Sequence, residues 1–301
     1  MLTHSVSITD KVLFDAYLKS SPYGSSDLNF TNLFMWRHLY KLKYEVIEDL
    51  LWISGVYYDK PFLLPPLFKD SGALTTLPAS LEVLKGHFDK VNHPFMIKFL
   101  PAEVVGLFES IAPQLFRFQR DRDNDDYIYL SKDLMELKGR KLHSKKNHLN
   151  FFRKHMEFDY VSLTKELMGD CLALTQRLKG GNYSDLELDL LQNEEFAIKE
   201  ALQHMDQLQI VGSTIWVDGQ LEAFTFGERL TEDTMLVHIE KANAEIRGLY
   251  QAINQQFCIH HCEDVIYVNR EEDMGFDYLR KAKESYNPIK MLEKYDVFLN
   301  I

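Results

Sequence analysis

The sequence has little cysteine and no long apolar run, and each absence excludes a class of protein. Only 3 cysteines occur in 301 residues, too few for the disulfide framework of a small secreted domain. No stretch approaches the roughly 20 consecutive apolar residues of a membrane-spanning helix. Residues 1–11 also lack the basic and apolar regions of a secretory signal. We therefore expect a cytoplasmic protein with no transmembrane segment.

Several common catalytic motifs are also missing. We find no phosphate-binding P-loop, no glycine fingerprint for dinucleotides, no Gly-x-Ser-x-Gly elbow and no His-Glu-x-x-His motif. Cys258 and Cys262 lie four residues apart, as on one helix face, but His260 and His261 would point away from that face. Four ligands for a zinc ion therefore do not converge. The sequence predicts buried structural cysteines, no metal site and no covalent nucleophile.

Apolar residues make up 46% of the chain and aromatic residues 13%, which is enough for a folded core. A length of 301 residues fits two domains or one large one. The run 121–126, Asp-Arg-Asp-Asn-Asp-Asp, is polar and prone to turns, and we take it as the seam between two halves. Residues 1–122 would form the first half and residues 123–301 the second.

The formal net charge is −11, but one segment has the opposite sign. Residues 138–155, KGRKLHSKKNHLNFFRKH, contain seven lysines or arginines, three histidines and no acid. The spacing of Leu142, Leu149, Phe152 and Met156 predicts a helix with one apolar stripe. Such a basic segment attracts phosphate-bearing ligands, although an ordinary solvated helix face is the simpler alternative. The candidate phosphate-binding residues are Lys138, Arg140, Lys141, Lys145 and Lys146.

The second half contains the clearest local signal. Two β-prone runs, 210–217 and 221–227, flank Asp218-Gly219, whose residues accept the positive φ angles of a type I′ hairpin turn. The elements predicted after this hairpin are a strand over 234–241, a helix over 246–261, a strand over 265–269, a helix over 274–283 and a strand-like stretch over 289–299.

Two polar segments of the second half are candidate sites. In 240–250, EKANAEIRGLY, a helix begins near Arg247-Gly248, where exposed N–H groups favour an anion. In 268–288, VNREEDMGFDYLRKAKESYNP, many polar residues follow the end of a strand. The simpler alternatives are an ordinary strand–helix turn for the first segment and a solvated loop with a salt-bridged helix for the second.

Together, the hairpin, third strand, glycine-containing turn and following strand resemble the core of the GNAT superfamily of N-acyltransferases. Segments 127–152, 236–257 and 268–288 more specifically resemble the C-terminal domain of phosphatidylglycerol lysyltransferases and its bacterial relatives. The resemblance implies an α+β fold of two tandem GNAT-like halves, each a mixed, largely antiparallel sheet flanked by helices. It also implies that the first half is degenerate and that the second carries the site.

The resemblance implies transfer of an activated acyl group, with no covalent enzyme intermediate. The donor is aminoacyl-tRNA in lipid-modifying members and acetyl-CoA in typical acetyltransferases, which bind it with a turn written Arg/Gln-x-x-Gly-x-Gly/Ala. Only Gly248 matches this turn, since Glu245 and Tyr250 occupy its first and last positions. The bulky Tyr250 would crowd a pyrophosphate, whereas the basic segment suits a tRNA acceptor end. We expect the donor to be a co-substrate and no cofactor to be tightly bound.

We therefore predict an aminoacyltransferase that moves an aminoacyl group from aminoacyl-tRNA to an amine or hydroxyl of a small molecule, lipid or peptide. A CoA-dependent N-acyltransferase and a non-catalytic RNA- or protein-binding module remain as alternatives. Glu240 or Asp273 would accept the proton of the acceptor or hold a cationic amine of the donor, and Tyr286 would act as an acid. The residues expected to hold the donor are Arg247, Gly248, Leu249 and Tyr250, and those expected to line the same cleft are Asn269, Arg280 and Lys283.

Overall fold

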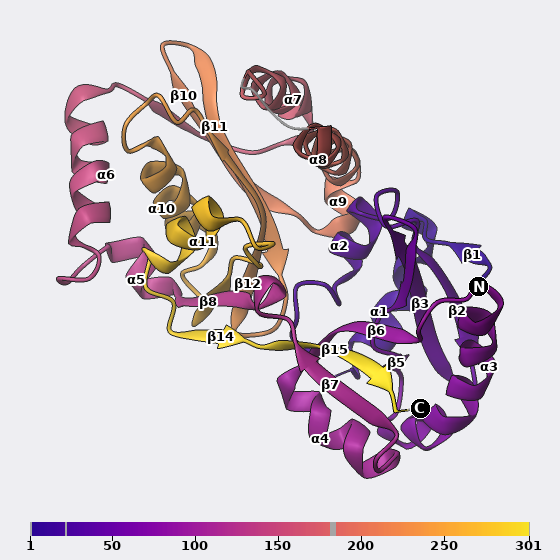
Figure 1. Cartoon of the computed structure of the whole chain (residues 1–301). Helices are drawn as coiled ribbons and strands as arrows, with labels where there is room; N and C mark the ends of the chain where they lie inside the picture. The colour runs from indigo at the N-terminus through magenta and orange to yellow at the C-terminus, as the bar shows by residue number, and fades with distance from the viewer. Residues whose placement is uncertain (1, 22, 181–184, 301) are drawn as a thin grey trace. The chain divides into compact units, whose positions relative to one another are not determined.

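The computed structural model describes residues 2–21, 23–180 and 185–300, which form two compact units (Figure 1). Unit 1 comprises Met1–Asp125 and Leu292–Ile301, and unit 2 comprises Asp126–Met291. The first boundary lies within the polar run 121–126. The C-terminal ten residues differ from the expected division, because their strand pairs within the sheet of unit 1. Every helix in the described part of the chain is too short or too polar to cross a membrane.

Unit 1 is built on a sheet that is antiparallel except where β4 meets β6. Its strands, in spatial order, are β1 (His4–Ser5), β2 (Lys43–Ile47), β3 (Leu50–Tyr57), β4 (Lys60–Leu63), β6 (Met96–Pro101), β15 (Lys294–Leu299) and β7 (Phe116–Arg120), with β5 (Leu67–Phe68) paired to β3. Its helices are α1 (Lys11–Leu18), α2 (Phe30–Met35), α3 (Leu77–Lys90) and α4 (Ala102–Ile111).

Unit 2 contains a second sheet, in which β12 and β13 run parallel. Its strands, in spatial order, are β14 (Lys290–Leu292), β8 (Asp126–Leu130), β13 (Tyr267–Asn269), β12 (Thr234–Ala242), β11 (Gln220–Arg229), β10 (Val211–Val217) and β9 (Asp159–Ser162). Its helices are α5 (Ser131–Glu136), α6 (His143–His155), α7 (Met168–Arg177), α8 (Asp185–Gln203), α9 (Met205–Leu208), α10 (Leu249–His261) and α11 (Asp277–Glu284). Figure 1 shows α6 and α10 on one side of this sheet and α7 and α8 on the other.

The two halves thus have the predicted α+β character, each with a largely antiparallel sheet and flanking helices. The hairpin β10–β11 turns at Asp218 and Gly219, whose φ angles are 51° and 75°, as the Asp-Gly signal predicts. The predicted strand 289–299 is wrong as a single element, because it divides into β14 in one sheet and β15 in the other.

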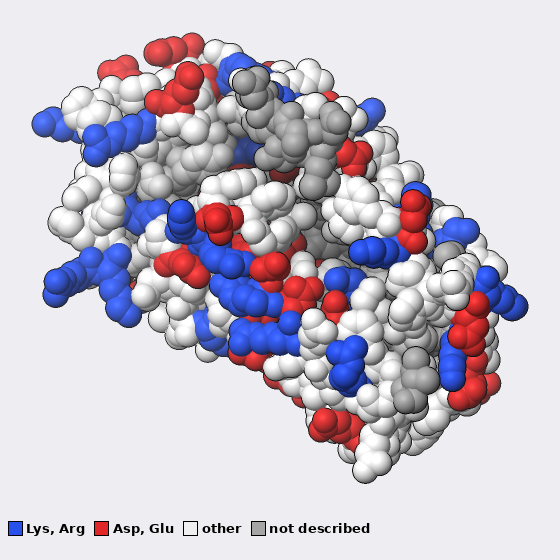
Figure 2. All heavy atoms as spheres, viewed as in Figure 1, with Lys and Arg blue, Asp and Glu red and all other residues white. Residues whose placement is uncertain are grey.

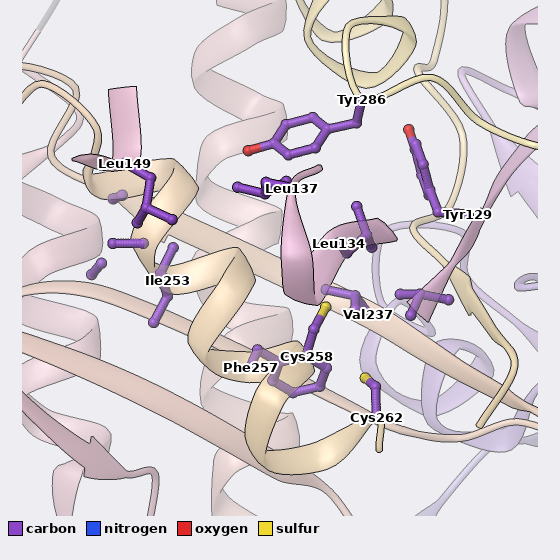
Figure 3. Close-up of a cluster of buried hydrophobic side chains, with 14 of the residues drawn as sticks. Tyr129, Leu134, Leu137, Leu149, Val237, Ile253, Phe257, Cys258, Cys262 and Tyr286 are labelled. Atoms are coloured by element: carbon purple, nitrogen blue, oxygen red, sulfur yellow. The ribbon is translucent and has the colours of Figure 1, made fainter. Parts of the chain in front are cut away.

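The basic segment becomes a helix only from His143 onward. Leu137 and Gly139 take φ angles of 46° and 88°, so residues 137–142 lie outside the helix and the prediction of a helix over the whole segment 138–155 is wrong at its start. The apolar stripe is confirmed, since Leu149 and Phe152 are fully buried. Figure 3 shows Leu149 near Ile253 of α10 in the core. The stripe therefore attaches α6 to the rest of unit 2 and leaves its polar faces outside.

The parallel strands β12 and β13 are paired over only three residues, and the place where their pairing ends is the feature of unit 2 that positions the candidate site. Pairing covers only Thr234–Leu236 with Tyr267–Asn269, whereas β12 continues to Ala242. Beyond Leu236 and Asn269 the two segments are no longer paired. A bulge between β11 and β12 at the same point leaves His238 outside the regular pairing. Side chains of β12 beyond the bulge consequently face residues that follow β13.

Candidate active site where two strands separate

Glu240 and Arg270 form a largely buried ion pair across the gap between β12 and the segment after β13. Their nearest atoms, Glu240 Oε1 and Arg270 Nη2, lie 3.0 Å apart, and the side chains are 12% and 11% exposed. Asn254 of α10 donates its Nδ2–H to Glu240 Oε2 at 3.0 Å. Low solvent access strengthens this attraction compared with a surface pair.

Two aromatic rings and a lysine surround this ion pair. The Arg270 guanidinium lies over the rings of Tyr286 and Tyr129, at 4.8 and 5.6 Å from their centroids. Lys145 of α6 places its ammonium 4.4 Å from the centroid of Tyr286. Burial and the nearby Arg270 lower the pKa of Lys145. We call Glu240, Arg270, Asn254, Tyr286 and Lys145 the Glu240 cluster. It joins the basic segment to both polar segments that the sequence singles out.

The Glu240 cluster contains polar atoms that the protein does not use. Asn254 Oδ1, Arg270 Nη1 and the Tyr286 hydroxyl are buried and have no hydrogen-bond partner among the described residues. Buried polar groups are normally satisfied, because leaving one unpaired costs about 1–3 kcal/mol. Burial also raises the pKa of the Tyr286 phenol, although Arg270 and the nearby side chain of Gln251 oppose the shift, so this hydroxyl keeps its proton at neutral pH. One acceptor, one cationic donor and one hydroxyl are therefore available to a polar ligand.

Asp273, the other predicted catalytic carboxylate, has a different environment. Its Oδ2 accepts from the Tyr127 hydroxyl at 2.6 Å and from Arg280 Nε at 3.0 Å, and its Oδ1 accepts from Gly275 N–H and Arg280 Nη2 at 2.9 Å each. Burial opposes ionisation, but the hydrogen bonds from Arg280 and Tyr127 lower the pKa of Asp273 to about 2. These contacts make Asp273 a clamp for its own loop and a poor proton acceptor.

The three residues predicted to line the same cleft also hold the loop that contains Asp273. Asn269 is fully buried and donates to Asp126 at 2.9 Å, while its Oδ1 accepts from the Glu271 N–H at 2.8 Å. Lys283 Nζ donates to the carbonyl oxygens of Arg270, at 2.6 Å, and of Glu272. Arg280 is the ion-pair partner of Asp273. In the structure their side chains fix the backbone that carries Arg270, and their contact with a ligand stays a prediction.

The predicted donor-binding turn is covered by α6. Gly248 has a φ angle of 91°, and a Cβ built there would lie 2.2 Å from the His148 carbonyl oxygen. The glycine thus permits the close approach of a helix, where the sequence suggested room for a phosphate. Leu249 is buried in the core, whereas Tyr250 is 37% exposed. Arg247 is exposed, and its guanidinium lies 4.4 Å from the centroid of the Phe151 ring.

The other basic residues lie at the start of α6 and in the turns before it. Lys138 is exposed and its Nζ lies 3.2 Å from Glu136 Oε2, while Lys146 donates to the Glu136 carbonyl oxygen at 2.8 Å. Arg140 and Lys141 are exposed and make no ion pair within the described ranges. Among all the described residues, no group of histidine, cysteine and carboxylate side chains is arranged to hold a metal ion. Cys258 and Cys262 are buried, as predicted.

Sequence reasoning missed Arg270, Asn254 and His238. His238, at the bulge in β12, lies between two carboxylates, 3.0 Å from Glu228 and 3.1 Å from Glu271. Burial alone would lower its pKa, but the two carboxylates raise the pKa of His238 to about 9. The imidazolium therefore ties β11 and β12 to the segment after β13. The position of Arg270 directly after a strand was the signal in the sequence that could have identified it as a site residue.

Comparisons with known proteins agree with this architecture. The family model for the C-terminal domain of phosphatidylglycerol lysyltransferase matches residues 19–298. A conserved Bacteroides thetaiotaomicron protein of unknown function is 34% identical, with a TM-score of 0.85 and full coverage of both chains. The C-terminal domain of an Agrobacterium fabrum protein assigned as a lysylphosphatidylglycerol synthetase is 13% identical, with a TM-score of 0.64, covering 98% of this chain and 93% of that one. A tandem GNAT protein of clavulanic acid biosynthesis is 10% identical, with a TM-score of 0.50 and coverage of 98% and 97%. The fold is therefore that of tandem GNAT proteins.

Proposed function

Because this chain belongs to the family of phosphatidylglycerol lysyltransferase C-terminal domains, we propose that it transfers an aminoacyl group from aminoacyl-tRNA to an amine or hydroxyl. The family supports an acyltransferase activity, and lysyl transfer by the enzymes that name the family supports an amino acid as the acyl group. The observation that carries the proposal is the Glu240 cluster, where three distant segments leave buried polar atoms unused.

The cluster supplies the groups that direct acyl transfer needs. The acceptor nitrogen or oxygen attacks the carbonyl carbon of the donor ester and gives a proton to Glu240. Arg270 Nη1, a buried donor without a partner, stabilises the oxyanion that forms. The ester bond to the ribose then breaks, and the leaving oxygen takes a proton from the Tyr286 hydroxyl. The proton held by Glu240 balances the one that Tyr286 gives, so both groups return to their starting states through proton exchange with water.

Acetyl-CoA is a weaker candidate for the donor. Helix α6 lies against Gly248, and Tyr250 occupies the last position of the turn that binds pyrophosphate in typical acetyltransferases. Seven lysines and arginines of unit 2 lie outside this turn, in the acid-free segment 138–155. This distribution favours a donor that carries many phosphates over a larger surface.

The test is an assay with two donors. Purified protein is incubated with radiolabelled total aminoacyl-tRNA or with radiolabelled acetyl-CoA, with phosphatidylglycerol vesicles as the hydroxyl acceptor and a lysine-containing peptide as the amine acceptor. We expect label to enter an acceptor from aminoacyl-tRNA, and faster deacylation of the tRNA with water as acceptor. Ribonuclease treatment of the donor should abolish both. Labelling from acetyl-CoA alone, or no effect on either donor, would overturn the proposal.

A further inference from the structure

Three exposed planar side chains of unit 2, Phe151, His155 and Arg247, lie against one another. The rings of Phe151 and His155, one turn apart on α6, stack with centroids 4.2 Å apart and an interplanar angle of 24°. The guanidinium of Arg247, from the turn before α10, lies 4.4 Å from the centroid of the Phe151 ring. All three residues are exposed, and Phe151 retains 37% of its accessible surface. We call them the stacking column.

Hydrogen bonds fix the orientation of the column. His155 Nδ1 donates to the Phe151 carbonyl oxygen at 2.8 Å, and Arg247 Nε donates to His148 Nδ1 at 3.4 Å. The buried stripe of α6, through Phe152, anchors the helix to the core. The planar groups are therefore held in position before any ligand arrives, which reduces the entropy that binding would cost.

The charge around the column suits a polyanion. Lys154 lies next to His155 on α6, and Arg140 and Lys141 lie in the turns before the helix; all three are exposed and have no ion pair among the described residues. In Figure 2 lysine and arginine side chains stand along the edge of unit 2 that carries α6. These cations occur in a chain of net charge −11, so they define a local positive surface.

We propose that the stacking column binds the bases of a single-stranded RNA end, while the neighbouring lysines and Arg140 contact its phosphates. Bases stack on aromatic and guanidinium planes irrespective of sequence, and this combination with a basic surface is typical of single-strand binding. An isolated phosphate or a lipid headgroup has no planar group that would use the column. The inference deepens the proposed function and rests on it, because the RNA would be the end of the tRNA that carries the aminoacyl group.

The experiment measures the affinity of the full-length protein for a fluorescein-labelled RNA of eight nucleotides by fluorescence anisotropy. We expect Phe151→Ala to weaken binding by about tenfold or more, because stacking on one aromatic ring contributes that much, and Phe151→Trp to restore it. The matched control is Phe196→Ala on α8, since Phe196 is also 37% exposed but lies outside the basic segment. Melting temperatures of all variants establish that they are folded.

Salt dependence separates stacking from charge. Lys154→Ala should reduce the slope of log affinity against log salt by about 0.7, the value for one phosphate contact to a single strand, whereas Phe151→Ala should leave the slope unchanged. Equal binding by the Phe151→Ala and Phe196→Ala proteins would overturn the proposal. So would equal affinity for duplex RNA, or Phe151-dependent binding to anionic phospholipid vesicles. RNA binding through Phe151 without aminoacyl transfer would refute the proposed function alone, and transfer that is indifferent to Phe151 would refute the column alone.

Discussion

Glu240 and Asp273 are both carboxylates of unit 2 near the parallel strands β12 and β13, and their surroundings differ in one respect. Asp273 accepts hydrogen bonds from Tyr127 of β8, Gly275 of its own loop and Arg280 of α11, and these bonds fix the loop. Around Glu240, by contrast, buried polar atoms remain unused. A satisfied network rigidifies a protein, whereas an incompletely satisfied one identifies where a ligand or water would bind. The loop clamped by Asp273 therefore supports the site at Glu240.

The largest effect should come from Glu240→Gln. We expect the rate of aminoacyl transfer to fall about 100-fold to 10,000-fold, the range typical for loss of a general base. The fold should persist with reduced stability, because the glutamine oxygen can still accept from Arg270 while the buried guanidinium loses its counter-charge. A rotated Asn254 can then offer its unused Oδ1 to the new amide. Single-turnover transfer and thermal unfolding measure the two effects, and wild-type activity in this variant would refute the role of Glu240.

Asp273→Asn should affect stability instead. Both oxygens of Asp273 accept two hydrogen bonds, so either orientation of an asparagine places an N–H group against a donor. We expect a loss of about 3–5 kcal/mol in the free energy of unfolding, as when one partner of a buried pair is removed. Urea unfolding of both variants gives the comparison directly. A stable but inactive Asp273→Asn protein would reverse the roles that the structure gives the two carboxylates.

Much of the local structure of unit 2 was predictable from the sequence. The Asp218-Gly219 turn and the apolar stripe of α6 depend on short-range sequence, and both were correct. The start of α6 was misplaced because the positive φ angles at Leu137 and Gly139 interrupt the helix. The short edge strand β9 was missed, since Asp159–Ser162 offers only four residues of pattern.

The site was harder to predict, because it depends on register. Glu240, Tyr286 and Lys145 were named from sequence, but for unrelated reasons in three separate segments. Arg270 reaches Glu240 only because the pairing of β12 with β13 stops at Leu236 and Asn269. Local sequence does not record where a parallel pair ends. It likewise does not distinguish a carboxylate whose hydrogen bonds are all used from one that remains available.

His238 provides a third way to sharpen the comparison, through pH. Its pKa is about 9 in the folded protein and 6.5 ordinarily, so its ion pairs with Glu228 and Glu271 stabilise the fold fully below pH 6.5. This contribution is lost as pH rises through 9. We expect wild-type stability to fall by about 3 kcal/mol between pH 6.5 and 9 relative to His238→Gln. Parallel pH profiles of unfolding for the two proteins would contradict the charged state of His238.

The smallest effect tests the unused atoms themselves. The Tyr286 hydroxyl has no hydrogen-bond partner in the described part of the chain, whereas the Tyr129 hydroxyl donates to the Lys283 carbonyl oxygen at 2.8 Å. Tyr129→Phe should cost about 1 kcal/mol of unfolding free energy, the net value of one buried hydrogen bond. Tyr286→Phe should cost less than about 0.5 kcal/mol, because it removes a group that the free protein does not pair. If the Tyr286 hydroxyl protonates the leaving oxygen, Tyr286→Phe lowers the rate of transfer even though it barely changes the stability.

Equal loss of stability in the two variants would mean that the Tyr286 hydroxyl is already paired in the free protein. Only two unused atoms, Asn254 Oδ1 and Arg270 Nη1, would then distinguish the Glu240 cluster from the hydrogen-bonded surroundings of Asp273.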